Sequence, residues 1–204
     1  MRWARFLLIW AALAAAIAVP LAVAASSPLL AWREPVYIAA GFAGIVALAL
    51  MLVQPLLAGG YLPGVPVLPG RRVHRVTGSL LILAVVVHVL GLWITSPPDV
   101  IDALLFVSPT PFAVWGVIAM WAVFAAGLLA AFRRRLRLRP RVWRVGHTVL
   151  VSVTIAGSVV HALRVEGAMG TVSKTVLCAL ILVATAKVIA DLRVWATARR
   201  KSAP

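Results

Sequence analysis

Long apolar runs, separated by short segments rich in polar residues, glycine and proline, dominate the pattern of this chain. A helix needs about 20 apolar residues to cross the hydrocarbon core of a bilayer. Six runs reach roughly that length, and they cover residues 5–24, 36–58, 74–95, 112–132, 143–163 and 171–190. The pattern predicts an all-α membrane protein, folded as a six-helix transmembrane bundle in a single domain over residues 1–204.

The composition supports this prediction and narrows the range of partners. Apolar residues make up 63% of the chain, and the mean hydropathy is +1.05, which exceeds what a soluble domain needs. The net charge is +15, but the basic residues lie mainly between or after the apolar runs and form no aromatic-interleaved patch. We therefore expect membrane lipid, and no nucleic acid, as a partner. The single cysteine, Cys178, cannot form an internal disulfide.

The charges between the runs orient the bundle. One set of segments contains Arg2, Arg5, Arg71, Arg72, Arg75, the seven arginines from Arg133 to Arg144, and Arg193, Arg199, Arg200 and Lys201. The alternate set contains four of the five acidic residues, namely Glu34, Asp99, Asp102 and Glu166. Because cytoplasmic loops of membrane proteins are enriched in Lys and Arg, both termini are expected in the cytoplasm. The predicted location is the bacterial inner membrane, with several passes through it.

The first apolar run also resembles a cleavable signal peptide, because it follows Arg2 and Arg5 and ends near Ala22-Val23-Ala24. At about 19 residues it is longer than the 7–15 residues usual for the apolar part of such a peptide. We therefore expect a retained first helix. Cleavage would leave five spans and the same orientation for the rest.

Histidine is the most informative residue type in the chain. There are four histidines, and they form two pairs with the same spacing of 14 residues: His74 and His88, then His147 and His161. In an α-helix, 14 residues return to within about 40° of the starting direction and advance about 21 Å along the axis. Both members of a pair therefore share one helix face, near opposite ends of the span.

The third and fifth spans, which carry the histidines, both run from the cytoplasm outward. If they face each other, His74 lies level with His147 and His88 lies level with His161. Neutral imidazole is a common axial ligand of heme iron, and two imidazoles at one level can hold one heme. The pattern predicts two hemes b stacked between the third and fifth helices. Zinc fits less well, because ligands about 21 Å apart cannot share one ion. A heme-free transporter that uses the histidines as a proton relay is the alternative outside redox chemistry.

Small and basic residues flank the histidines. Gly78 lies four residues after His74, and Gly157 lies four residues before His161, so each can let a flat porphyrin approach its helix. Glycine also serves ordinary helix packing in membranes. The candidate partners of the heme propionates are the arginines Arg72, Arg75 and Arg144, since guanidinium binds carboxylate bidentately. The alternative is that these arginines serve topology alone.

The chain resembles the ferric reductase-like transmembrane domain family, which includes ferric reductases, NADPH oxidase membrane domains and the heme-binding subunit of the periplasmic methionine sulfoxide reductase. The resemblance covers residues 36–192. It rests on two segments, each with a second histidine farther along: Arg71-Arg72-Val73-His74-Arg75 with His88, and Arg141-Val142-Trp143-Arg144-Val145-Gly146-His147 with His161.

The resemblance implies six helices and two stacked hemes b, with His74 and His147 on the cytoplasmic-side heme iron and His88 and His161 on the outer one. The implied role is transmembrane electron transfer to an acceptor on the outer side. The chain shows no G-x-G-x-x-G motif after a strand, so we expect electrons from a separate flavin reductase or a quinol, or from bound FMN or FAD. The alternative is a heme-binding subunit that passes quinol or flavin electrons to a periplasmic sulfoxide reductase. Either way the chain is expected to be an oxidoreductase component.

Overall fold

The computed structural model describes residues 2–192, and all the regular elements within them are helices. The long helices are α1 (Arg2–Ala25), α2 (Pro35–Ala58), α3 (Val67–Thr95), α5 (Ala113–Phe132), α6 (Pro140–Arg164) and α7 (Thr171–Asp191), and two short ones are η1 (Pro28–Leu30) and α4 (Pro97–Leu104). All six long helices are apolar enough to cross a membrane, which confirms the prediction of a multi-pass, six-helix membrane protein. The expected cytoplasmic residues Arg193, Arg199, Arg200 and Lys201 lie outside the described residues.

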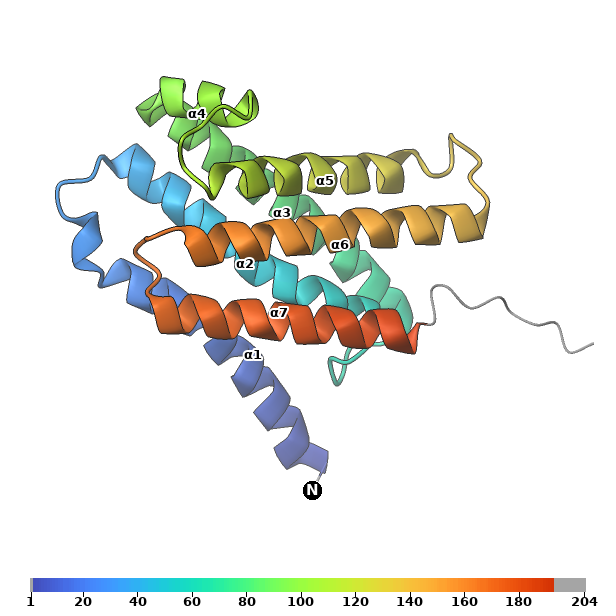
Figure 1. The fold of residues 1–204 in the computed structure, drawn as a ribbon. Coiled ribbons are helices and arrows are strands. Elements are labelled where there is room, and N and C mark those ends of the chain that lie inside the picture. The colour runs from blue at the N-terminus through green and yellow to red at the C-terminus, as the bar shows by residue number, and fades with distance from the viewer. Residues whose placement is uncertain (1, 193–204) are drawn as a thin grey trace, which may run out of the picture.

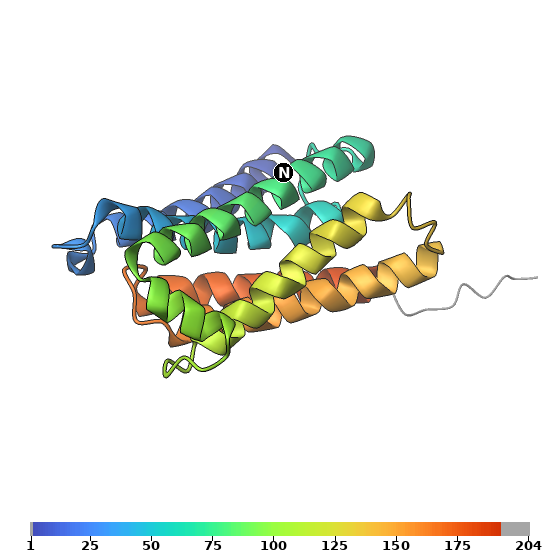
Figure 2. The same cartoon turned by 90° about the horizontal axis from the view of Figure 1, so that it is seen from above.

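The connecting segments gather at two ends of the bundle (Figure 1 and Figure 2). The basic end contains the segments 59–66 and 133–139 and the last turn of α7. The acidic end contains the segment 26–34, the α4 region and the segment 165–170. This alternation separates the arginine-rich segments from Glu34, Asp99, Asp102 and Glu166, as the charge pattern predicts.

Helix α3 is longer than the apolar run that predicts it. It begins at Val67, seven residues before the expected start at position 74, and so includes Pro69 and Gly70. The first four N–H groups of a helix have no partner within it, so a proline in the first turn removes no hydrogen bond. The structure also adds α4, which follows Ser96 in a segment expected to be a loop. There the hydroxyl of Ser96 donates to Asp99 over 2.6 Å.

The bundle is built from two antiparallel hairpins, α2 with α3 and α5 with α6. Helix α7 packs against α2 and α6, and α1 packs along α2 and α7 at the edge. The buried core joins α2, α3, α6 and α7 and consists of Leu48, Met51, Leu52, Leu81, Ile155, Val159, Met169, Leu177, Cys178 and Ile181. By contrast, α3 and α6, which carry the histidines, scarcely touch.

Candidate functional site

The four histidines stand where the two hairpins adjoin, two on α3 and two on α6. All four imidazoles are partly buried. His74 and His147 are close enough for a charge on one ring to act on the other, and the same holds for His88 and His161. These two neighbour relations lie one toward the basic end and one toward the acidic end, and the binding of a heme by each pair stays a prediction.

The acidic-end histidines each bond to the helix that precedes their own. Nδ1 of His88 lies 2.7 Å from the carbonyl oxygen of Ala40 on α2, and Nδ1 of His161 lies 2.9 Å from that of Phe112, the N-cap of α5. A carbonyl oxygen can only accept, so Nδ1 carries the proton and donates in both bonds. The lone pair of the neutral ring is then on Nε2, which is the arrangement of a metal-binding histidine oriented by a backbone carbonyl.

The basic-end histidines have weaker partners. Nδ1 of His74 lies 3.3 Å from the carbonyl oxygen of Gln54 on α2. Nδ1 of His147 is buried without a hydrogen bond; the carbonyl of Ala126 on α5 is close but outside bonding geometry. The two levels thus differ in how firmly their imidazoles are held.

The acceptor positions reveal an internal repeat that the sequence analysis missed. Ala40 and Gln54 are 14 residues apart on α2. Phe112, the N-cap of α5, and Ala126 are also 14 residues apart, and this is the spacing of the histidines that these residues face. The α2–α3 and α5–α6 hairpins therefore present the same arrangement twice, running in the same direction. Such direct repeats are a known way to build a membrane protein around a central site.

Two glycines that the sequence analysis did not single out make room for the acidic-end rings. A β-carbon on Gly44 would lie 3.0 Å from Nδ1 of His88, and one on Gly116 would lie 2.7 Å from Nδ1 of His161. Each glycine is four residues after the carbonyl that its histidine contacts, Ala40 and Phe112 respectively, so it lies on the same helix face. Gly44 and Gly116 occupy matching positions of the repeat, which the sequence could have shown. Only the fold shows that a side chain at either position would meet a histidine ring.

The predicted glycines lie against neighbouring helices. A β-carbon on Gly157 would lie 2.8 Å from the carbonyl oxygen of Trp115, so this glycine allows close packing of α6 on α5. Gly78 faces the side chain of Gln54 on α2 at an ordinary contact distance. The packing contribution of both glycines is thus visible, while their expected contact with a porphyrin stays a prediction.

Trp143 has a more specific place than its basic-end position suggests. Its ring stacks on His147 with centroids 5.5 Å apart and planes 9° apart, and the guanidinium of Arg133 lies 4.2 Å from the centroid of the Trp143 ring. The indole Nε1 is buried without a hydrogen-bond partner. The stack orders the ring of His147, whose own Nδ1 lacks a partner, and brings a cation near it.

The predicted arginines Arg72, Arg75 and Arg144 are all exposed at the basic end. Arg144 lies three residues before His147 and so shares its helix face, whereas Arg72 and Arg75 adjoin His74 in sequence but lie on other faces of α3. The arginine that matches Arg144 in the α2–α3 hairpin is Arg71, three residues before His74.

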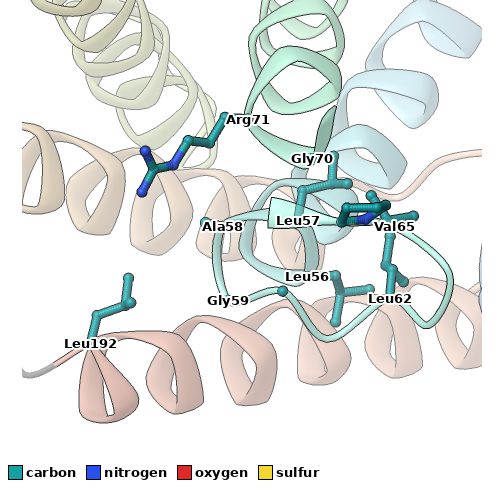
Figure 3. A pocket seen from close by; sticks show the side chains of 11 residues that line it. Leu56, Leu57, Ala58, Gly59, Leu62, Val65, Gly70, Arg71 and Leu192 are labelled. Carbon is teal, nitrogen blue, oxygen red and sulfur yellow. The ribbon is translucent and has the colours of Figure 1, made fainter. Parts of the chain in front are cut away.

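Arg71 lines a pocket of about 240 Å³ beyond the basic-end histidine pair (Figure 3). Leucine side chains and glycine backbone from the end of α2 and the segment after it form most of the wall. Leu56, Leu62 and Val65 lie close to one another, whereas Arg71 and Leu192 are set apart from them and from each other. Arg71, about one helical turn before His74 on α3, thus adds a guanidinium to a mostly apolar pocket.

The donor set fits heme better than a bare ion. Within residues 2–192 there is no group of three or more His, Cys, Asp or Glu side chains that could hold a metal ion. One imidazole from each hairpin at each level is instead the ligand set of a bis-histidine heme, and the separation of α3 from α6 is compatible with a flat group between them. The Nδ1–H bonds to Ala40 and Phe112 leave Nε2 free for that purpose.

Comparison with known proteins identifies the family of the chain. Residues 43–158 match the family model described as ferric reductase like transmembrane component. The match covers more than half of the chain and includes His74, His88 and His147, but it ends before His161. No curated protein and no solved structure matches the chain. On the family match and the six membrane-length helices, the chain belongs to the ferric reductase-like transmembrane family.

Proposed function

We propose that the chain holds two hemes b between α3 and α6 and transfers electrons across the membrane as a component of an oxidoreductase. The family match supports a membrane electron-transfer role. The observation that carries the two-heme proposal is the association of His74 with His147 and of His88 with His161, on helices that scarcely touch. Heme b bound there would supply reversible one-electron chemistry at its iron.

In this proposal the chain orients the ligands and sets their surroundings. Ala40 and Phe112 accept the Nδ1 protons of the acidic-end histidines, which keeps each Nε2 directed away from its own hairpin. Arg144, which shares the helix face of His147, would bind a heme propionate at the basic end. Arg72 and Arg75 would do so only by reaching around α3, because they lie on other faces than His74. Gly78 and Gly157 would let the porphyrins approach the helices that carry the histidines.

The direction of transfer follows from the orientation. With the basic end in the cytoplasm, both termini are cytoplasmic and the protein lies in the bacterial inner membrane. Electrons would enter at the His74–His147 level and leave at the His88–His161 level. The donor would be a separate flavin reductase, a quinol, or bound FMN or FAD. The acceptor would be on the outer side, either a substrate such as ferric iron or a partner oxidoreductase such as a periplasmic sulfoxide reductase.

A heme assay with reduced-minus-oxidised spectra tests the proposal directly. Purified protein should contain about two hemes b per chain. His74→Ala and His147→Ala should each remove the same heme, and His88→Ala and His161→Ala the other, because one ligand from each helix is lost. Spectra that pair His74 with His161 would contradict the assignment of levels.

A protein that binds no heme would overturn the proposal. The heme-free alternative, a transporter that uses the histidines as a proton relay, then predicts proton flux in reconstituted vesicles. In that alternative, flux should fall in each of the four histidine variants.

A further inference from the structure

A glutamine inside the bundle distinguishes the two hairpins. Gln54 lies on α2 opposite His74, and the matching position on α5, opposite His147, is Ala126. Polar side chains within membrane helices are rare unless they bond to other protein groups. Gln54 does so: its amide nitrogen donates to the hydroxyl of Thr77 on α3 over 2.8 Å.

The same amide also faces His74. Its other end, the oxygen Oε1, lies 3.0 Å from Nδ1 of His74, so this ring nitrogen has both the backbone and the side chain of Gln54 beside it. Thr77 helps to decide the orientation. Its single hydroxyl proton is donated to the carbonyl of Val73 over 2.8 Å, so toward Gln54 it can only accept. On that contact the amide presents N–H to Thr77 and Oε1 to His74, but Oε1 then also faces the carbonyl oxygen of His74 at 3.2 Å, and the amide nitrogen faces the N–H of Gly78 at 3.1 Å. Iron on Nε2 of His74 would favour this orientation, because the neutral ring then carries its proton on Nδ1.

A half-turn of the amide gives a second network. Its N–H groups would then donate to Nδ1 and to the carbonyl oxygen of His74, and Oε1 would accept from Thr77 and from the N–H of Gly78. An Nδ1 that accepts a hydrogen bond carries no proton, so the neutral ring must carry it on Nε2. The amide orientation and the availability of Nε2 for a metal are therefore linked.

We propose that Gln54 is a positioning residue for His74. The amide oxygen of Gln54 accepts a hydrogen bond from Nδ1–H of His74, which keeps Nε2 free for iron and lowers the reduction potential of the basic-end heme. The inference rests on the proposed two-heme function. A hydrogen bond from Nδ1–H raises the basicity of the imidazole as a ligand, which favours ferric over ferrous iron. His147 has no such partner at Ala126, so the two ligands of the basic-end heme are inequivalent.

Redox titration of the full-length protein in nanodiscs tests the inference, with the basic-end heme assigned by its loss in His147→Ala. Gln54→Met keeps the size of the side chain and removes the acceptor. We expect its basic-end potential to rise by the equivalent of about a tenfold change in the reduction equilibrium, or about 59 mV for one electron. The acidic-end potential should not change, which makes it an internal control.

Gln54→Glu separates this role from simple packing. A carboxyl group keeps an acceptor oxygen for His74, so the potential should stay at or below the wild-type value. Thr77→Val should raise the potential in the same direction as Gln54→Met but by less, because the amide loses the partner that orients it. Unchanged potentials in Gln54→Met, or equal upward shifts in the Met and Glu variants, would overturn the inference.

Loss of the basic-end heme in a Gln54 variant also tests the inference. If Gln54→Met lacks the basic-end heme, recovery of that heme in Gln54→Glu supports the inference, and equal loss in both overturns it. Failure of the proposed function is distinguishable, since wild-type protein would then contain no heme. If wild-type protein contains two hemes and their potentials do not change when Gln54 is substituted, only the role of Gln54 is rejected.

Discussion

A β-carbon at Gly116 would lie 2.7 Å from Nδ1 of His161. The ring is held there because Nδ1 donates to the carbonyl of Phe112, four residues before Gly116. The imidazole therefore reaches the backbone of α5 through space that only glycine leaves open. Gly44 serves His88 in the same way on α2, with a slightly wider separation of 3.0 Å.

Gly116→Ala should displace the ring of His161 and reduce occupancy of the acidic-end heme, and Gly44→Ala should have a smaller effect on His88. Heme content per chain and the reduced spectrum measure this. Gly41→Ala is the matched control, because no atom lies within 4 Å of its added β-carbon. That variant should keep both hemes and gain about 0.5–1 kcal/mol of helix stability. Equal heme loss in Gly41→Ala and Gly116→Ala would exclude a specific clash.

Trp143→Leu should weaken the basic-end site, because His147 loses the ring that stacks on it and has no hydrogen bond to replace that contact. Trp143→Phe keeps an aromatic plane and should retain most of the heme. Optical and electron paramagnetic resonance spectra of the basic-end heme provide the readout. Trp121→Leu is the control for loss of a bulky ring, since Trp121 is exposed and packs on Phe124. Identical spectra in Trp143→Leu and wild type would show that the stack is dispensable.

Lys174→Met should lower thermal stability. Lys174 is only 8% exposed, and its ammonium donates to the carbonyl of Val165 over 2.6 Å, just after the end of α6. A cation near a helix C-terminus is favourable, and a hydrogen bond of a charged group contributes about 1.5–3 kcal/mol. We expect a loss of about 1–2 kcal/mol, measured as a fall in the unfolding temperature.

The matched control for Lys174 is Lys187, at the other end of α7. Its side chain is 58% exposed, and it pairs with Asp191 over 2.7 Å. Exposed pairs spaced by four residues contribute about 0.3–0.5 kcal/mol, so Lys187→Met should change stability little. A larger effect at Lys187 than at Lys174 would contradict the assignment of Lys174 to the end of α6.

Tyr61, in the basic-end segment, should ionise at unusually high pH. Burial, together with the hydrogen bond it donates to Asp191 over 2.6 Å, raises the pKa of Tyr61 from 10.0 to about 12. Because the folded-state pKa is raised, the stabilising contribution is complete below pH 10 and is lost as pH rises through about 12.

Absorbance titration of tyrosinate measures the Tyr61 prediction. The chain has two tyrosines, so a Tyr37→Phe background isolates Tyr61. Asp191→Asn in that background should move the ionisation to lower pH, because the negative charge beside the phenol is removed. An ionisation of Tyr61 near pH 10 in the folded background protein would contradict the hydrogen bond.

Several elements of the fold follow from local sequence alone. Apolar runs of membrane length predict the six long helices, because crossing a bilayer is a requirement on each segment separately. The prediction is wrong by seven residues at the start of α3, since prolines and glycines near position 66 read as a loop although a first helical turn tolerates them. The apolar pattern does not predict helix α4, because this helix has 8 residues and is too short to cross a membrane.

The family resemblance, the six spans and the shared helix face within each histidine pair (His74 with His88, His147 with His161) all follow from the sequence, because apolar run length and a spacing of 14 residues on a helix are local properties. That His74 lies level with His147 and His88 with His161 depends on how α3 and α6 are placed, and the sequence supports it only through the direction of the two spans. The groups that orient the histidine rings become visible only when the helices are packed together. The bonds of His88 and His161 reach carbonyls 48 and 49 residues away, and such contacts depend on the register between antiparallel helices. Gly44 and Gly116 recur at matching positions of the two hairpins, but the sequence does not show which atoms a side chain there would meet, and Gln54 has no polar counterpart at Ala126. Their roles therefore arise from the packing of each hairpin.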